Sequence, residues 1–194
     1  MILAYQRSTC PRGPPPTEES HLCCVSSPTR VEGSSLFRRE GTRLDCSPLT
    51  ERLFTGAAIS STSDVDQLVQ AGVTAIIDAR AEFDDAAIIM ANHPSILYLW
   101  DGAQDDGQPK PPEWFKKALD FAMPILARPG QILFTHCAAG HNRGPSLAYA
   151  VLRAQGWPSH DALHLIHVKR PQTVGGIAYA PDAERALHQL GWVR

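Results

Sequence analysis

The sequence contains no long apolar run. A membrane-spanning helix needs about 20 consecutive apolar residues, and no stretch of this chain comes near that length. The opening segment MILAYQRSTCPRG has only a short apolar stretch, broken at Gln6 and Arg7, and lacks the ordered regions of a secretory signal. We therefore expect a cytoplasmic protein that does not associate with membranes.

A large excess of one charge is also absent. The 194 residues include 18 Lys and Arg and 20 Asp and Glu, which gives a net charge of -2 at pH 7. Domains that bind nucleic acid usually carry a strong basic excess, because they neutralise phosphate groups. The composition gives no reason to expect nucleic acid as a partner, and we expect the protein to be a monomer.

Cysteines in metal-binding pairs are missing as well. The chain has five cysteines, an odd number, and none of them show the paired spacing of a zinc site. Four precede the apparent core: Cys10, Cys23, Cys24 and Cys46. Cys137 stands alone in the body of the domain, which fits a reducing compartment better than a disulfide framework. We expect no metal ion and no other cofactor.

The chain divides into two parts by composition. Residues 1–47 are rich in Pro, Ser, Gly and charge and have almost no apolar periodicity, so we expect a disordered N-terminal extension. An arm that binds a partner is the alternative for this segment. Residues 48–194 are long enough to form one domain with a sizeable core.

Within this domain, short apolar runs alternate with amphipathic segments. The expected strands are 52–56, 73–80, 95–100 and 131–136, and the expected helices are 61–72, 82–92, 112–127, 144–156, 159–169 and 180–190. This alternation predicts an α/β fold with a mostly parallel central sheet of four to five strands flanked by helices. In such folds, ligands bind at the carboxyl ends of the strands.

The segment FTHCAAGHNRGPS, residues 134–146, follows the last predicted strand. Backbone N–H groups of this loop and the start of the next helix can bind a phosphate group, and Gly140 permits the turn that this requires. Arg143 can grip two phosphate oxygens. Such an electropositive loop favours the thiolate of Cys137, which can attack phosphorus. The predicted phosphate-binding residues are Ala138, Ala139, Gly140, His141, Asn142 and Arg143.

His136-Cys137, five further residues and Arg143, with Gly140 between them, resemble the signature loop of cysteine-dependent protein tyrosine phosphatases. The resemblance covers about residues 49–191, and the order of the elements is similar to the dual-specificity branch. It implies a dual-specificity-phosphatase-like fold, a phosphocysteine intermediate and phosphorylated protein substrates. It also implies that Cys137 is the nucleophile and that Arg143 binds phosphate and stabilises the transition state.

A general acid must protonate the leaving group, and the segment WDGAQDDGQPKPP offers three carboxylates. DDGQPKPP resembles the acid loop of the phosphatases of regenerating liver, and this match assigns the acid to Asp106. The spacing typical of dual-specificity phosphatases favours Asp105 instead, and Asp101 is a third candidate. Repulsion between adjacent carboxylates can raise one pKa and keep a proton available near neutral pH.

Gly144 departs from the pattern of many of these enzymes, which carry Ser or Thr directly after the loop arginine. That hydroxyl helps the cysteine sulfur to leave when water hydrolyses the intermediate. RGPS is closer to the Arg-Ala-Pro of the regenerating-liver group, and Ser146 lies too far along the helix to substitute. We therefore predict normal phosphate capture and slow breakdown of the intermediate. His136 is expected to support the loop with its side chain pointing away from the sulfur.

Several alternatives stay open at this stage. Cys137 could be a packed structural thiol, a metal ligand with His136 and His141, or the centre of a rhodanese-like sulfur transferase. A further alternative is a phosphate- or partner-binding module with weak or no catalysis. The loop contains no Lys, and no Arg besides Arg143, which favours phosphoproteins over inositol phospholipids as substrates.

Two other groups of residues have competing interpretations. One helix carries three histidines at a spacing that allows metal binding, although an amphipathic surface helix explains them better: His160, His164 and His167. Asp78 and Arg80, at the end of a predicted strand, could line the rim of the site or pair with each other.

Overall fold

The computed structural model describes residues 44–173 and 176–193. The predicted extension lies outside this range except for residues 44–47. The strands are β1 (Cys46–Pro48), β2 (Leu53–Gly56), β3 (Ala75–Arg80), β4 (Leu97–Ala103) and β5 (Leu133–His136). The helices are α1 (Thr62–Gln70), α2 (Ala86–Asn92), α3 (Pro112–Leu126), α4 (Arg143–Ala154), α5 (Ser159–Lys169) and α6 (Ala180–Gln189), with a short 3-10 helix at Pro171–Thr173.

The five strands form one sheet in the order β1-β2-β5-β3-β4. β1 is antiparallel to β2, and the other neighbours are parallel, with Leu133 of β5 opposite both Leu53 and Ala75. The predicted α/β class with a mostly parallel sheet is therefore confirmed. β1 was not predicted, because three residues ending in a proline show no strand pattern. Pro48 is tolerated there because β1 is an edge strand.

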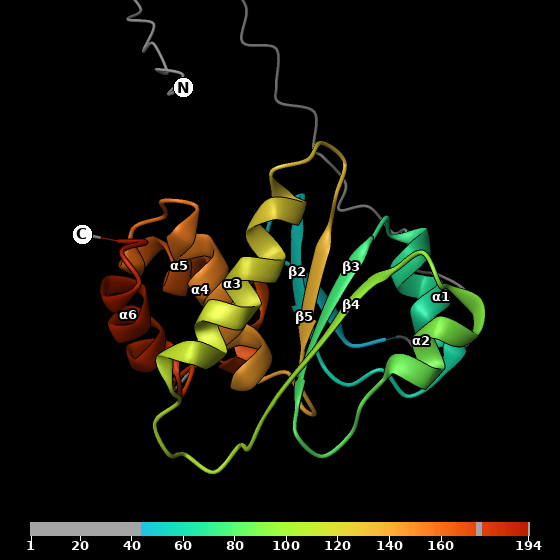
Figure 1. Cartoon of the computed structure of the whole chain (residues 1–194), viewed down its shortest axis with the longest axis horizontal. Helices are drawn as coiled ribbons and strands as arrows, with labels where there is room; N and C mark the ends of the chain where they lie inside the picture. Colours follow the sequence, from blue (N-terminus) through green and yellow to red (C-terminus); the bar gives the residue numbers. More distant parts are fainter. Residues whose placement is uncertain (1–43, 174–175, 194) are drawn as a thin grey trace, which may run out of the picture. The chain divides into compact units, whose positions relative to one another are not determined.

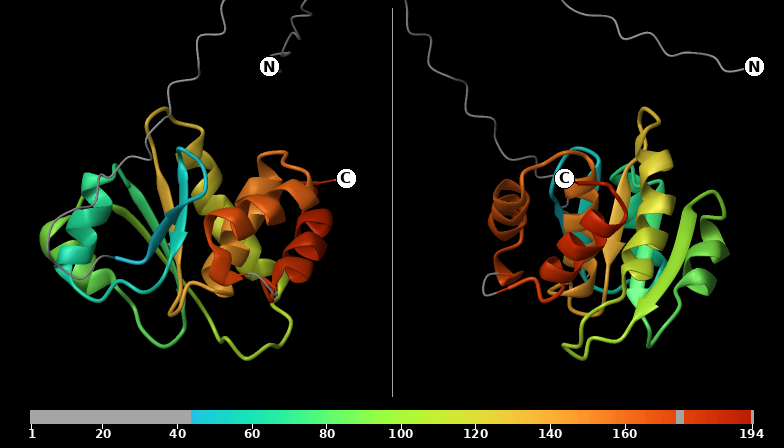
Figure 2. Two further views of the ribbon diagram at one scale, coloured as in Figure 1. Left: turned by 180° about the vertical axis from the view of Figure 1, so that it is seen from behind. Right: turned by 60° about the vertical axis from the view of Figure 1, so that its left-hand side comes forward.

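Helices cover both faces of the sheet (Figure 1). α1 and α2 lie on one face, and α3, α4, α5 and α6 lie on the other, as the views in Figure 2 also show. β3 is buried along its whole length between these layers, so its residues alternate between two cores. Ile76 packs into the core beneath α1 and α2, and Ile77 packs into the core beneath α3 to α6. None of the described helices is long and apolar enough to cross a membrane.

The second predicted helix begins later than its sequence pattern suggested. We expected helix from residue 82, but α2 begins at Ala86. Asp84 accepts a hydrogen bond from the Ala86 amide at 2.9 Å, and Glu82 turns its carboxylate toward Arg143. Residues 82–85 therefore form a loop that serves other contacts.

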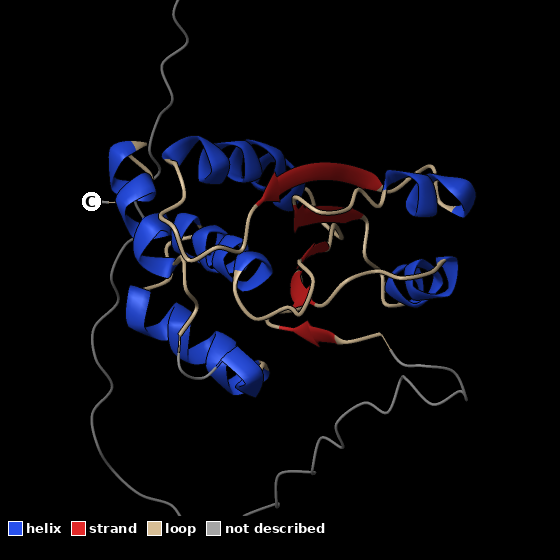
Figure 3. Ribbon diagram, turned by 90° about the horizontal axis from the view of Figure 1, so that it is seen from below, coloured by secondary structure: helices blue, strands red, loops and turns tan. Residues whose placement is uncertain are grey.

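Three loops meet at the carboxyl ends of the parallel strands. They follow β3, β4 and β5 and lie at the bottom of Figure 1; Figure 3 looks onto this end of the molecule from below. The loop after β5 is the predicted phosphate-binding loop, residues 137–143, which we call the cysteine loop. The loop after β4, residues 104–111, contains Asp105 and Asp106 and is called the acid loop. The topology therefore brings together segments about 30 residues apart in the sequence.

Candidate active site

The cysteine loop joins β5 to the first turn of α4. Cys137 is 1% exposed and lies in the core beneath α3 to α6. Gly140 adopts a φ of 66°, a conformation that side chains disfavour. A Cβ atom there would also overlap the backbone of Gly56, 2.5 Å from its carbonyl carbon. Two independent constraints therefore require glycine at this position.

Arg170, which follows α5, supports the backbone of the cysteine loop. This fully buried residue donates from Nε to the Gly140 carbonyl at 2.5 Å and from Nη2 to the Ala139 carbonyl at 3.2 Å. Its guanidinium also forms two hydrogen bonds of 2.8 Å with the Asp45 carboxylate. In a trans peptide the N–H points opposite to the C=O. The N–H groups of Gly140 and His141, which share peptide units with these two carbonyls, therefore point away from Arg170. The sequence pattern did not identify this role for Arg170.

Arg143 at the other end of the loop is held by Glu82. Nη1 and Nη2 donate to the two carboxylate oxygens of Glu82 at 2.7 Å and 2.8 Å, and Nη1 also donates to the Ala103 carbonyl at 2.8 Å. These hydrogen bonds lower the pKa of Glu82 to about 2. A guanidinium has five N–H groups, so Nε–H and one Nη2–H form an edge without a hydrogen bond, where Nε lies 3.5 Å from Asp105 Oδ2. That edge can bind two oxygens of one anion.

Glu82 is a site residue that sequence reasoning missed. The available signal was its position two residues after β3, at the same end of the sheet as the cysteine loop. The pattern did not distinguish Glu82 from Asp84 and Asp85 nearby. Only the fold shows which carboxylate reaches Arg143.

His136 lies on the opposite face of the sheet from Cys137, as successive strand residues do. It is fully buried and stacks on Phe134 with ring centroids 5.3 Å apart. Burial lowers its pKa to about 4, so the ring is neutral at pH 7. Its Nε2 lies 3.4 Å from a carboxylate oxygen of Asp85. His136 therefore supports the strand beneath the loop and does not face the sulfur.

Asp78, Asp85 and His136 form a buried group whose potential ligand atoms lie within 4.8 Å of one another. Arg80 forms ion pairs with both carboxylates, at 3.0 Å to Asp78 and 2.5 Å to Asp85, while the two oxygens of Asp85 have no hydrogen-bond partner among the described residues. Of the two interpretations for Asp78 and Arg80, the structure shows the pair. The other proposed metal set does not come together, because His136 and Cys137 lie on opposite faces and His141 is exposed.

The two adjacent aspartates of the acid loop point in different directions. Oδ1 of Asp105 accepts hydrogen bonds from the Tyr179 hydroxyl at 2.8 Å and from Asn142 Nδ2 at 3.3 Å. Its Oδ2 lies 3.5 Å from Nε of Arg143. Asp106 instead pairs with Lys110 Nζ at 2.6 Å, and this hydrogen bond lowers its pKa. The structure thus brings Asp105 to the cysteine loop, whereas Asp106 turns away.

Asp101, the third candidate acid, is buried beneath α3. Its carboxylate lies 3.2 Å from Lys117 Nζ, and burial raises its pKa. No contact joins Asp101 to Cys137 or Arg143 among the interactions of the described residues. Its neighbours give it a structural role between β4 and α3.

Gly144 leaves no room for a side chain. A Cβ atom at this position would lie 2.9 Å from two backbone carbons of His136. Ser146 Oγ donates to the Asn142 carbonyl at 2.7 Å, within its own helix. The first turn of α4 therefore packs directly on the end of β5, with Ser146 turned toward the helix backbone.

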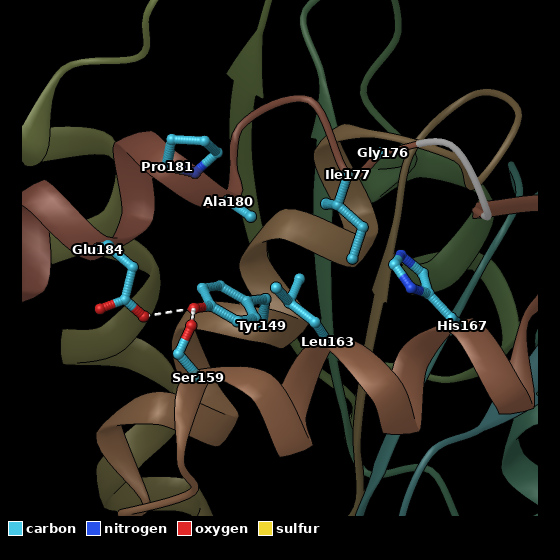
Figure 4. Close-up of a pocket in the computed structure, with 9 residues that line it drawn as sticks. All are labelled: Tyr149, Ser159, Leu163, His167, Gly176, Ile177, Ala180, Pro181 and Glu184. Atoms are coloured by element: carbon cyan, nitrogen blue, oxygen red, sulfur yellow. Dashed lines mark hydrogen bonds between the residues drawn. The ribbon is translucent and has the colours of Figure 1, made fainter.

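A separate cavity of about 330 Å³ lies between α4, α5 and α6 (Figure 4). Its walls include the apolar side chains of Leu163 and Ile177. Tyr149 and Glu184 also line it and are hydrogen-bonded to each other. The lining contains no Lys or Arg, so this cavity has little chemistry for a phosphate group.

Solved structures show where this architecture has been seen before. A mouse putative dual specificity phosphatase complexed with zinc tungstate matches with a TM-score of 0.63 and 17% identity, over 81% of this chain and 98% of that chain. Human DUSP28 matches with a TM-score of 0.61 and 18% identity, over 75% and 95%. The chain has the dual-specificity phosphatase fold.

A third match with this fold is the human tyrosine phosphatase-like serine/threonine/tyrosine-interacting protein. It aligns with a TM-score of 0.60 and 19% identity, over 76% of this chain and 99% of that chain. No protein-family model and no curated protein sequence matches the chain. The expected resemblance to cysteine-dependent phosphatases is thus confirmed in the fold, and the chemistry must be argued from the site.

Proposed function

We propose that this protein is a phosphomonoester hydrolase that acts on phosphotyrosine or phosphoserine/threonine proteins through a phosphocysteine intermediate. The observation that carries the proposal is the free edge of Arg143, held by Glu82 at the mouth of a loop that begins with Cys137. An arginine edge of this kind suits the oxygens of a phosphate group. The absence of further Lys or Arg in the loop favours phosphoproteins over inositol phospholipids.

In the first step, the Cys137 thiolate attacks phosphorus. The S–P bond forms while the bond from phosphorus to the leaving oxygen breaks, and Asp105 transfers its proton to that oxygen. Arg143 and the loop amides bind the remaining phosphate oxygens, where charge accumulates in the transition state. The products of this step are the free alcohol or phenol and the phosphocysteine.

In the second step, a water molecule attacks the phosphocysteine. The Asp105 carboxylate takes a proton from the water, the S–P bond breaks, and inorganic phosphate and the thiolate are released. Gly144 supplies no hydroxyl to stabilise the departing sulfur. We therefore expect this step to be slower than the first one.

Asp105 replaces Asp106 as our first choice for the general acid. Only Asp105 has a carboxylate oxygen near the Arg143 edge, at 3.5 Å. Asp106 is exposed and paired with Lys110. The local similarity to the regenerating-liver group had favoured Asp106, but adjacent residues in a loop can point in opposite directions.

Stopped-flow hydrolysis of p-nitrophenyl phosphate tests this function. We expect the wild-type protein to release a burst of nitrophenolate followed by slower turnover, and Cys137→Ser to show neither. With phenyl phosphate, Asp105→Asn should lower kcat/KM by about 10²-fold, and the matched Asp106→Asn by less than about threefold.

Two outcomes would contradict the proposal or part of it. If the wild-type protein binds tungstate but shows no turnover dependent on Cys137, the chain is a phosphate-binding module on this fold. If Asp106→Asn has the large effect and Asp105→Asn does not, the acid is Asp106. The first result concerns the hydrolase activity and the second concerns only the identity of the general acid.

A further inference from the structure

Tyr179 holds the acid loop at two points. It is 1% exposed and occupies the N-cap position of α6 without a side-chain capping hydrogen bond. Its hydroxyl donates to Oδ1 of Asp105 at 2.8 Å and accepts from the Gly107 amide at 3.2 Å. One hydroxyl group therefore binds both neighbours of Asp106 and fixes the turn between them.

The ring of Tyr179 is itself held firmly. Trp114 of α3 packs edge-on against it, with ring centroids 6.3 Å apart. Lys110 Nζ lies over the Tyr179 ring, 4.6 Å from its centroid. The Lys110 amide also donates to Asp182 of α6 at 2.8 Å. The hydroxyl therefore presents a fixed position to the acid loop.

The hydrogen bonds of Asp105 decide which of its two oxygens carries the proton. Its Oδ1 receives two donors, the Tyr179 hydroxyl and Asn142 Nδ2, at 2.8 Å and 3.3 Å. An oxygen that accepts from two donors is a poor place for a proton. When Asp105 is protonated, the proton therefore resides on Oδ2, the oxygen 3.5 Å from the free edge of Arg143.

We propose that Tyr179 is a positioning residue for the general acid: its hydroxyl directs the protonated oxygen of Asp105 toward the phosphate site. The proposal rests on the proposed hydrolase function, which it extends to a residue outside both loops. Tyr179 does not touch the reacting atoms. It acts through its hydrogen bonds to Asp105 and Gly107 of the acid loop.

Tyr179→Phe tests this role because it removes the hydroxyl and keeps the ring contacts. A poor leaving group depends on the acid more than a good one does. We expect kcat/KM for phenyl phosphate to fall at least about tenfold, and kcat/KM for p-nitrophenyl phosphate to fall less than about threefold. The ratio kcat/KM reports the first chemical step even where breakdown of the intermediate limits turnover.

Tyr149→Phe is a matched control. Tyr149 is also 1% exposed, and its hydroxyl also donates to a carboxylate, that of Glu184 (Figure 4). It lies in the cavity between α4, α5 and α6 and has no described contact with the acid loop. We expect the ratio of the two kcat/KM values to stay at the wild-type value in this variant.

Amide hydrogen exchange gives a second readout that does not need turnover. The Gly107 amide loses its acceptor in Tyr179→Phe, so its exchange should become faster in this variant and stay unchanged in Tyr149→Phe.

The positioning role is overturned if Tyr179→Phe slows both substrates equally, if Tyr149→Phe produces the same selective loss, or if Gly107 exchange does not change. A wild-type protein with no Cys137-dependent turnover would instead overturn the hydrolase function and the catalytic role of Tyr179 together. Failure of the positioning role alone leaves wild-type turnover intact, so the two results are distinguishable.

Discussion

Three of the five N–H groups of Arg143 are bonded within the protein, two to Glu82 and one to Ala103. This use of the donors orients the guanidinium plane and leaves one edge for a ligand. The side chain therefore does not have to be ordered when phosphate binds, which reduces the entropic cost of binding.

Glu82→Gln should weaken this orientation, because an amide oxygen replaces one charged acceptor and an amide N–H₂ faces the guanidinium. We expect kcat/KM for p-nitrophenyl phosphate to fall about 10- to 100-fold, which corresponds to about 1.5–3 kcal/mol. Glu113→Gln is the control, because Glu113 is exposed in the first turn of α3. Equal activity of the two variants would show that Glu82 does not orient Arg143.

The choice between Asp105 and Asp106 shows a limit of sequence reasoning at this scale. The chain pattern identified the acid loop, but the direction of each carboxylate depends on the turn at Gly107, with a φ of 72°, and on Tyr179, more than 70 residues away. Glu82 was missed for the same reason. Its partner, Arg143, is distant in sequence, so no local pattern marks Glu82.

At the scale of elements, the contact between α4 and β5 is unusually close. Gly144 allows the first turn of the helix to rest on the backbone of His136, and the Thr135 hydroxyl donates to the Gly144 carbonyl at 3.0 Å. The strand therefore fixes the helix start through contacts with the backbone of Gly144. The helix start in turn fixes Arg143.

Gly144→Ser should consequently destabilise the protein, even though it would supply the hydroxyl found in many related signature loops. The new Cβ atom would force the backbone of β5 and α4 apart. We expect the free energy of unfolding, measured in urea, to fall by about 1–3 kcal/mol. Unchanged stability combined with faster breakdown of the phosphocysteine would contradict this expectation.

Most elements were predictable because their patterns are local. α1 has a capping box of Ser61 and Asp64, α3 begins at Pro112, and β3 begins with three consecutive apolar residues, 75–77. β1 and the start of α2 were not predictable. Both depend on contacts with distant partners, Asp45 with Arg170 and Glu82 with Arg143.

At the scale of the whole molecule, the group beneath the cysteine loop couples stability to pH. Burial lowers the pKa of His136 to about 4, below its ordinary value. The unfolded chain therefore binds a proton at His136 more tightly than the folded chain does, and stability falls as pH decreases. Burial raises the pKa of Asp85 to about 6, above its ordinary value. The folded chain therefore binds a proton at Asp85 more tightly than the unfolded chain does, and stability rises as pH decreases. Between about pH 4 and pH 6 the two effects oppose each other.

Asp85→Asn should remove one of these effects and expose the other. From pH 6.5 to pH 4.5, we expect this variant to lose about 2 kcal/mol more of its free energy of unfolding than the wild-type protein does. Urea denaturation at the two pH values measures the difference. Parallel changes in both proteins would show that His136 and Asp85 do not titrate in opposite directions.

The contact between Arg170 and Asp45 has a practical consequence for anyone who shortens this chain. Composition places the boundary of the domain at residue 48, yet Leu44 is 9% exposed and Asp45 supplies both carboxylate oxygens to the buried guanidinium. A protein that starts at residue 48 would keep every residue of the cysteine loop. It would nevertheless bury an arginine without its counter-ion directly behind that loop.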